Sequence, residues 1–140
     1  MSQPTSFRLP PGLVKRIDEE AAQRGMTMTR LVSSLLDEGL KTSRFAGVVY
    51  RDGPSGRRAG LAGGPDVWEV VRAVRASQGR GEARVQRVAQ ETEIPERLVH
   101  LAIEFAAAYP DEVDERIRLD EEAAEHLRGH VRARERLLGM

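Results

Sequence analysis

The feature that most constrains this chain is a short alternating segment near its start. Over Thr5–Leu9, Phe7 and Leu9 fall on one face while Ser6 and Arg8 fall on the other, which is the periodicity of a β-strand. Two prolines follow directly and end the strand, because proline cannot continue a hydrogen-bonded ladder. A strand needs a partner strand, and the residues around it offer none. The chain must therefore find that partner elsewhere.

Two amphipathic helices are predicted directly after the strand. The first spans about residues 11–24, with proline in its first turn and Gly25 at the position where a helix commonly ends. The second begins after Thr27, whose hydroxyl suits an N-cap, and ends near residue 42. Apolar side chains recur on each at helical spacing: Leu13, Val14, Ile17, Ala21 and Ala22 on the first, and Leu31, Val32, Leu35, Leu36 and Leu40 on the second.

One strand and two helices in roughly 40 residues bury too little surface to fold alone. The economical solution is a homodimer, in which two copies of the strand pair antiparallel across a two-fold axis. The predicted dimer core contains Phe7, Leu9, Leu31 and Leu35. A two-stranded ribbon fits the major groove of DNA.

Polar side chains on the outer face of the ribbon are the predicted DNA readers. Arg8 can donate two hydrogen bonds to a guanine, and Ser6 can reach a base or a phosphate. Backbone N–H groups at a helix N-terminus favour phosphate. The predicted phosphate-binding residues at the second helix are Thr27, Met28, Thr29 and Arg30.

These residues resemble the ribbon-helix-helix fold of the CopG, Arc and MetJ repressors over Thr5 to Leu40, about a quarter of the chain. The resemblance implies a dimeric DNA-binding module. In one departure, the first of the three outward strand positions that such proteins usually present falls on Pro4, which leaves Ser6 and Arg8 as readers. The alternative is a pure dimerisation module with Arg8 on a solvated surface.

The whole chain is predicted to be mostly α-helical, with three parts. Residues 4–43 form the ribbon-helix-helix module, residues 44–65 form a β-hairpin or linker, and residues 66–140 form a helical partner-binding domain. The hairpin strands fall near residues 48–50 and 57–61, around a glycine-rich turn. The helices are expected near residues 66–76, 82–91, 96–108 and 112–138, with Asp66 and Asp111 as caps. Gly129 is expected to bend or interrupt the last one.

The back part resembles helical domains of bacterial antitoxins that pair with PIN-domain-like toxins. The matching stretches are Gly56–Leu61, Val67-Trp68, Val88-Ala89 with Ile94-Pro95 and Val99, and Ala106–Pro110. This resemblance implies an antitoxin that represses its own promoter in double-stranded DNA. It also implies that residues 66–140 bind a metal-dependent ribonuclease, whose acidic site basic groups of the last helix would plug: Arg128, Arg132, Arg134 and Arg136. The alternatives are a stand-alone regulator whose back part oligomerises, and a last helix that is merely solvated.

Two features of the back part have competing interpretations. The helices on either side of Thr92–Pro95 are spaced like a helix-turn-helix, but the second carries Glu96, Glu104 and few basic residues. We interpret that pair as a packing or partner surface and not as a second DNA reader. Trp68, the single tryptophan, is either a core residue or an anchor for a partner.

Charge is distributed unevenly along a chain with no net charge. Residues 1–44 carry seven basic and five acidic groups, residues 45–81 six and three, and residues 82–140 nine and fourteen. A mildly basic front and an acidic back suggest a polyanion at one end and another partner at the other.

The inventory of reactive groups argues against an enzyme. The chain has no cysteine and no glycine-rich phosphate loop with lysine. Glu122, His126 and His130 share a helical face, a stripe that is usually only solvated, so no metal and no cofactor are expected. His100 is predicted at a helix surface or partly in the core. With no secretion signal and no membrane span in the sequence, we expect a cytoplasmic protein.

Overall fold

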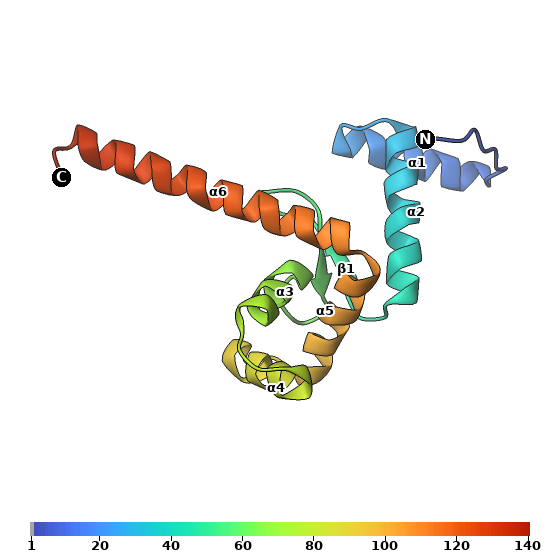
Figure 1. The fold of residues 1–140 in the computed structure, drawn as a ribbon. Helices are drawn as coiled ribbons and strands as arrows, with labels where there is room; N and C mark the ends of the chain where they lie inside the picture. The colour runs from blue at the N-terminus through green and yellow to red at the C-terminus, as the bar shows by residue number, and fades with distance from the viewer. Residues whose placement is uncertain (1) are drawn as a thin grey trace. The chain divides into compact units, whose positions relative to one another are not determined.

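The computed structural model describes residues 2–140, which form two compact units, residues 2–44 and residues 45–140 (Figure 1). Across residues 2–140 the protein is mostly α-helical, with six helices and one two-stranded antiparallel hairpin. The predicted fold class is confirmed at this level. No helix among these residues is long and apolar enough to cross a membrane.

The first unit contains the two predicted helices, α1 (Pro11–Arg24) and α2 (Met28–Arg44). Gly25 ends α1 in the left-handed conformation, with φ of 64°, which glycine adopts at little cost. Its N–H donates to the carbonyl of Ala22, and the next N–H donates to the carbonyl of Ala21. These two hydrogen bonds end helix α1 and redirect the chain towards α2.

The predicted strand over Thr5–Leu9 is absent from the single chain. Residues 2–10 form neither helix nor strand and are exposed. The physical reason is the missing partner strand, because a strand is held by hydrogen bonds to a neighbouring strand. None of the described residues supplies that neighbour for this segment.

The second unit begins with the predicted hairpin, which is confirmed. Strand β1 (Val48–Arg51) pairs antiparallel with β2 (Arg58–Leu61), so that Val48 lies opposite Leu61 and Arg51 opposite Arg58. Val48 and Leu61 are buried. The hairpin therefore has one face in the core of this unit.

Four helices complete the second unit: α3 (Val67–Ala76), α4 (Gly81–Thr92), α5 (Glu96–Ala108) and α6 (Pro110–Leu137). Each contributes its apolar stripe to one core, with α3 packed against α4, α5, α6 and β2. Phe105 is fully buried at its centre and makes an edge-to-face contact with Phe45. The largest fully buried side chains in this core are Phe105, Leu61, Val67, Val70, Val88 and Val99.

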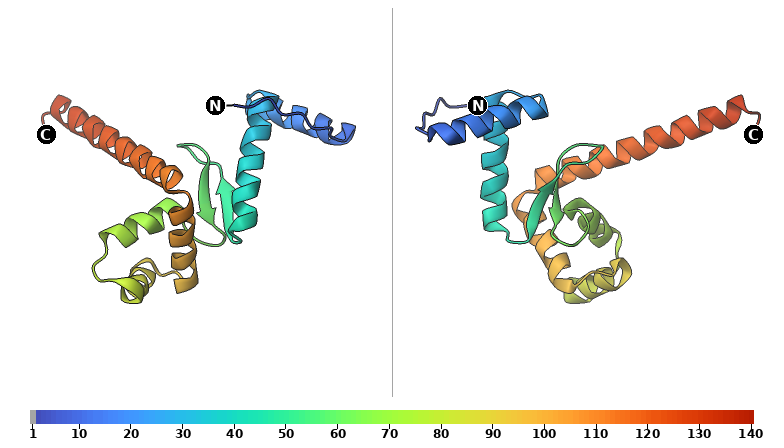
Figure 2. Two further views of the ribbon diagram at one scale, coloured as in Figure 1. Left: turned by 45° about the vertical axis from the view of Figure 1, so that its right-hand side comes forward. Right: turned by 180° about the vertical axis from the view of Figure 1, so that it is seen from behind.

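The helix boundaries agree with the sequence except at two places. Helix α6 begins at Pro110, one residue before the expected cap Asp111, because proline fits the first turn of a helix. It then runs unbroken through Gly129, so the predicted interruption there is wrong. Val113 and Ile117 anchor its first turns in the core, whereas its outer half extends away from α3, α4 and α5 (Figure 2).

Candidate functional sites

The predicted DNA readers lie on an exposed N-terminal segment. Ser6 and Arg8 are both exposed, and so are Phe7 and Leu9. Phe7 leaves 77% of its surface in water, an unfavourable position for so large an apolar side chain. Apolar and polar residues alternate along this segment, but the apolar side chains remain exposed in the single chain.

The first unit also leaves the facing sides of its helices open. Leu31 is completely buried between them, but Leu35 and Leu36 of α2 remain exposed, as do Leu13 and Val14 of α1. A hollow of about 390 Å³ lies between the two helices. Of residues 2–44, only Ala21 and Leu31 are buried apolar residues. The apolar face of this unit is therefore not covered by any other part of the unit.

The start of α2 is built as the sequence predicts. The Thr27 hydroxyl accepts a hydrogen bond from the backbone N–H of Arg30 at 3.2 Å, which confirms the N-cap. Thr29 and Arg30 are exposed, and Met28 is partly buried. The first backbone N–H groups of the helix thus lie at the surface, with the positive end of the helix dipole beside them.

Replacing Thr27 with alanine removes this cap. We expect Thr27→Ala to lower the free energy of unfolding by about 1 kcal/mol, measured by urea denaturation of the full chain. Ser43→Ala is the matched control, since Ser43 is exposed in the last turn of α2, outside both the cap and the predicted ribbon. Equal losses for both variants would contradict a stabilising cap at Thr27.

A buried ionic cluster joins the hairpin to α3 in the second unit. Asp66 is 7% exposed and accepts a hydrogen bond from Arg58 Nε at 2.8 Å and from the Trp68 indole N–H at 3.2 Å. Arg51 Nε lies 3.6 Å from its other oxygen. Asp66 stands at the predicted N-cap position, but its carboxylate makes no capping bond, so that part of the prediction is wrong. The carboxylate instead meets the two arginines.

Backbone groups next to this cluster hold the Arg51 side chain in place. The Nη2 group of Arg51 donates to the backbone carbonyls of Leu61, Gly64 and Pro65. A Cβ atom at Gly60 would collide with the Arg51 guanidinium, so a larger residue in the middle of β2 would require that side chain to move. Burial raises the pKa of Glu69 above its ordinary value, and the nearby charge of Asp66 acts in the same direction.

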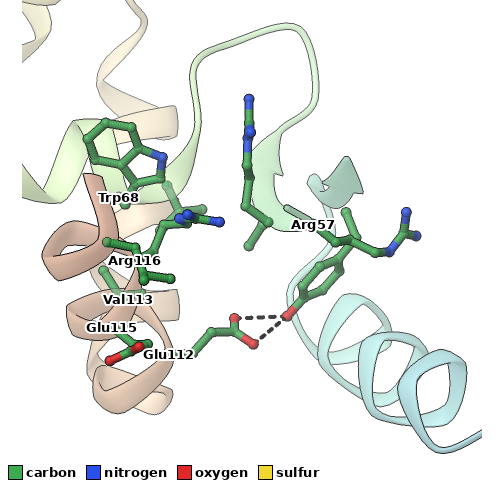
Figure 3. Close-up of a pocket in the computed structure, with 11 residues that line it drawn as sticks. Arg57, Trp68, Glu112, Val113, Glu115 and Arg116 are labelled. Atoms are coloured by element: carbon green, nitrogen blue, oxygen red, sulfur yellow. Dashed lines mark hydrogen bonds between the residues drawn. The ribbon is translucent and has the colours of Figure 1, made fainter. Parts of the chain in front are cut away.

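A pocket of about 210 Å³ lies beside this cluster, between the hairpin, the start of α3 and the start of α6. Figure 3 shows Trp68, Arg116, Val113, Glu115 and Glu112 around it. The dashed lines in the figure mark the bonds that the Tyr50 hydroxyl makes to the two Glu112 oxygens, at 2.9 and 3.0 Å. Tyr50, Arg57, Arg58, Ala59, Val67 and Leu119 complete the lining.

Comparison with protein-family models, with curated proteins and with solved structures finds no match to this chain.

Trp68 and His100 have defined surroundings in the second unit. Trp68 is partly buried against the core, lies within 5.5 Å of the Arg72 guanidinium and lines the pocket. The role as a core residue is thereby confirmed, whereas the role as an anchor for a partner stays a prediction. His100 sits partly exposed on α5, with Nε2 3.0 Å from a Glu82 oxygen on α4, as expected for a helix surface.

The charged residues of α6 mostly pair along their own helix. Glu122 accepts a hydrogen bond from Arg118, and Glu125 accepts hydrogen bonds from Arg128 and Arg132. Arg134 and Arg136 are exposed. Among residues 2–140, no group of three or more histidines and acidic residues is arranged to hold a metal ion, so Glu122, His126 and His130 do not form one.

Sequence reasoning missed the ionic cluster and the pocket. Arg51 and Arg58 lie opposite each other in the hairpin, and Asp66 follows five residues after β2. The sequence signal for the cluster was the occurrence of two arginines in short strands, which suggests that a nearby carboxylate pairs with them. The place of Arg116 in the pocket could not be predicted, since nothing in the sequence distinguishes it from the other arginines of this charged helix.

Proposed function

We propose that this protein is a dimeric DNA-binding repressor of the ribbon-helix-helix type. The observation that supports the proposal most is the open apolar face of the first unit. Phe7, Leu35 and Leu36 are exposed, and Leu31 is the one large apolar side chain of residues 2–44 that is buried. Such a face is stable in water only when another surface covers it. A second copy of the same unit is the simplest cover.

The N-terminal segment explains why that cover is a second copy. Two copies of Thr5–Leu9 can pair antiparallel about a two-fold axis, which gives each strand the partner that the single chain lacks. Phe7 and Leu9 then turn towards the four helices and close the apolar face. A two-fold interface of this kind uses the same patch on both protomers.

The same pairing presents a polar face to DNA. Ser6 and Arg8 alternate with the apolar residues, so the dimer carries each of them twice on the outside of the ribbon. Arg8 suits a guanine in the major groove, and the capped N-termini of the two α2 helices suit the flanking phosphates. The ribbon would read the bases while the helix ends fix its register.

We further propose that the protein is an antitoxin that represses its own promoter and neutralises a PIN-like ribonuclease through residues 66–140. The exposed outer half of α6, which carries Leu127, Leu137 and several arginines, supports this role because it is the kind of surface that a partner covers. Both activities belong in the cytoplasm. The second candidate is a stand-alone regulator, and a gene for a small acidic-site nuclease beside this one would favour the antitoxin.

A salt-titrated binding assay tests the DNA-binding proposal. We expect the full chain to bind the DNA upstream of its own gene, with an affinity that falls as salt rises because phosphate contacts release counterions. Arg8→Ala should lose about 1–3 kcal/mol for each base pair that Arg8 contacts and should bind operator and scrambled DNA more equally.

Arg136→Ala is the matched control, since it removes the same charge from an exposed site on α6. It should leave the preference for operator over scrambled DNA unchanged. If wild type and Arg8→Ala discriminate equally well, the assignment of Arg8 as a base reader is wrong. If neither binds DNA at low salt, the first unit is only a dimerisation module.

A further inference from the structure

The pocket of the second unit combines an apolar wall with a charged rim. Its volume of about 210 Å³ is several times the roughly 30 Å³ that one water molecule takes up in the liquid. Trp68, Val67 and Val113 form part of its wall, and all three belong to the core of the unit or pack against it. The wall is therefore held by rigid elements, which is typical of a preformed ligand site.

Most charged groups of the lining already have partners. Arg58 binds Asp66, and Arg57 lies 3.2 Å from Asp52. Glu112 accepts both bonds from Tyr50. Glu115 binds Arg118, and this hydrogen bond holds the pKa of Glu115 below its ordinary value. Both carboxylates of the pocket thus already accept hydrogen bonds from neighbouring side chains.

Arg116 is different from these groups. One of its terminal nitrogens donates to the carbonyl of Ser55 at 2.9 Å, which ties the hairpin turn to α6. Its Nε is buried and has no hydrogen-bond acceptor among the described residues. Arg116 forms no ion pair with a carboxylate among residues 2–140, although its charge helps to lower the pKa of the nearby Glu115. The exposed part of this guanidinium can therefore donate hydrogen bonds from its terminal N–H groups to an incoming anion.

We propose that this pocket binds a small organic carboxylate with a flat apolar body. The carboxylate accepts hydrogen bonds from Arg116, whose planar guanidinium matches the two oxygens of such a group. The apolar body lies against Trp68 and Val113. This proposal goes beyond DNA binding and does not depend on it, because every residue that it uses lies in the second unit.

The carboxylate is favoured over other anions by the charge of the lining. Arg57, Arg58 and Glu115 are paired with Asp52, Asp66 and Arg118, so Arg116 supplies the single positive charge that a ligand would meet. A singly charged ligand matches that one guanidinium, whereas a phosphate with two charges would also be repelled by Glu112 and Glu115. The apolar wall excludes small inorganic anions, since they would leave it unfilled.

Trp68 provides a direct readout, because it is the only tryptophan in the chain. We would titrate the full chain with benzoate and follow the tryptophan fluorescence and the single indole N–H signal in NMR spectra. We expect saturable changes with a dissociation constant of about 1 mM or lower, which is in the range accessible to so small a ligand. Benzamide has the same shape without the charge and should bind at least tenfold more weakly.

Two variants separate the role of Arg116 from general charge effects. Arg116→Gln should weaken benzoate binding at least tenfold, whereas Arg132→Gln, which removes an exposed charge on the same helix, should leave it unchanged. Benzoate that causes no saturable change, or that binds no better than benzamide, overturns the proposal. The benzamide comparison uses the wild-type chain, so the test holds even if Arg116→Gln fails to fold. DNA binding by Arg116→Gln, measured separately, shows whether the first unit is intact.

Discussion

Replacing Asp66 with asparagine should destabilise the second unit by about 3–5 kcal/mol, the usual cost of removing one partner from a buried ion pair. The Asp66 side chain is only 9% exposed, and Arg58 opposite it is 23% exposed. Without the carboxylate, the Arg58 and Arg51 guanidinium groups lie close together with no negative charge between them. Asparagine keeps the size of the side chain, so the loss reports on charge and not on a cavity.

Urea denaturation of the full chain, followed by Trp68 fluorescence, measures this effect in the second unit. Asp52→Asn is the matched control, because Asp52 is 80% exposed in its ion pair with Arg57 and such surface pairs contribute about 1 kcal/mol or less. We expect Asp52→Asn to stay within about 0.5 kcal/mol of wild type. Comparable stability of the two variants would mean that the cluster is solvated and that the Asp66 carboxylate is not essential.

The helices could be predicted from the sequence because their signals are local. The apolar stripe of residues 11–24, the left-handed Gly25 and the Thr27 cap all lie within a few residues of the structure that they determine. The same holds for the hairpin, where the glycine-rich turn separates two short apolar runs. Periodicity and capping are properties of neighbouring residues, and a single sequence records them directly.

The ionic cluster and the pocket could not be predicted because they depend on contacts between distant elements. Arg116 meets Ser55 across 61 residues, and Tyr50 meets Glu112 across 62. No periodicity links such positions. Asp66 illustrates the difficulty, since its location before α3 favoured a cap while the tertiary fold brought two arginines to it.

The predicted DNA-binding site is a different case, because in the proposed dimer half of it would come from another chain. The sequence shows the alternation of Thr5–Leu9, and the single chain leaves that segment without secondary structure. Both observations follow from one cause, which is that a strand without a neighbour has no hydrogen bonds to hold it. The dimer core assigned to Phe7, Leu9, Leu31 and Leu35 therefore stays a prediction, and only an experiment on two copies tests it.

Phe7→Asp should convert the proposed dimer to a monomer and abolish operator binding. Phe7 is exposed in the single chain, so the substitution costs the monomer little. In the proposed dimer it occurs twice in the shared core, where each aspartate would carry a buried charge without a partner. We expect the dissociation constant of the dimer to rise at least about 1000-fold, since central aromatic residues at interfaces commonly contribute 2 kcal/mol or more each.

Sedimentation equilibrium over a range of concentrations measures the association, and the operator-binding assay measures its consequence. Leu137→Asp is the matched control, because Leu137 is 88% exposed on the outer half of α6 and has no part in the proposed ribbon. It should leave both the dimer and DNA binding unchanged. A Phe7→Asp chain that still dimerises would show that the ribbon is not the interface, and loss of the dimer in Leu137→Asp instead would assign self-association to α6.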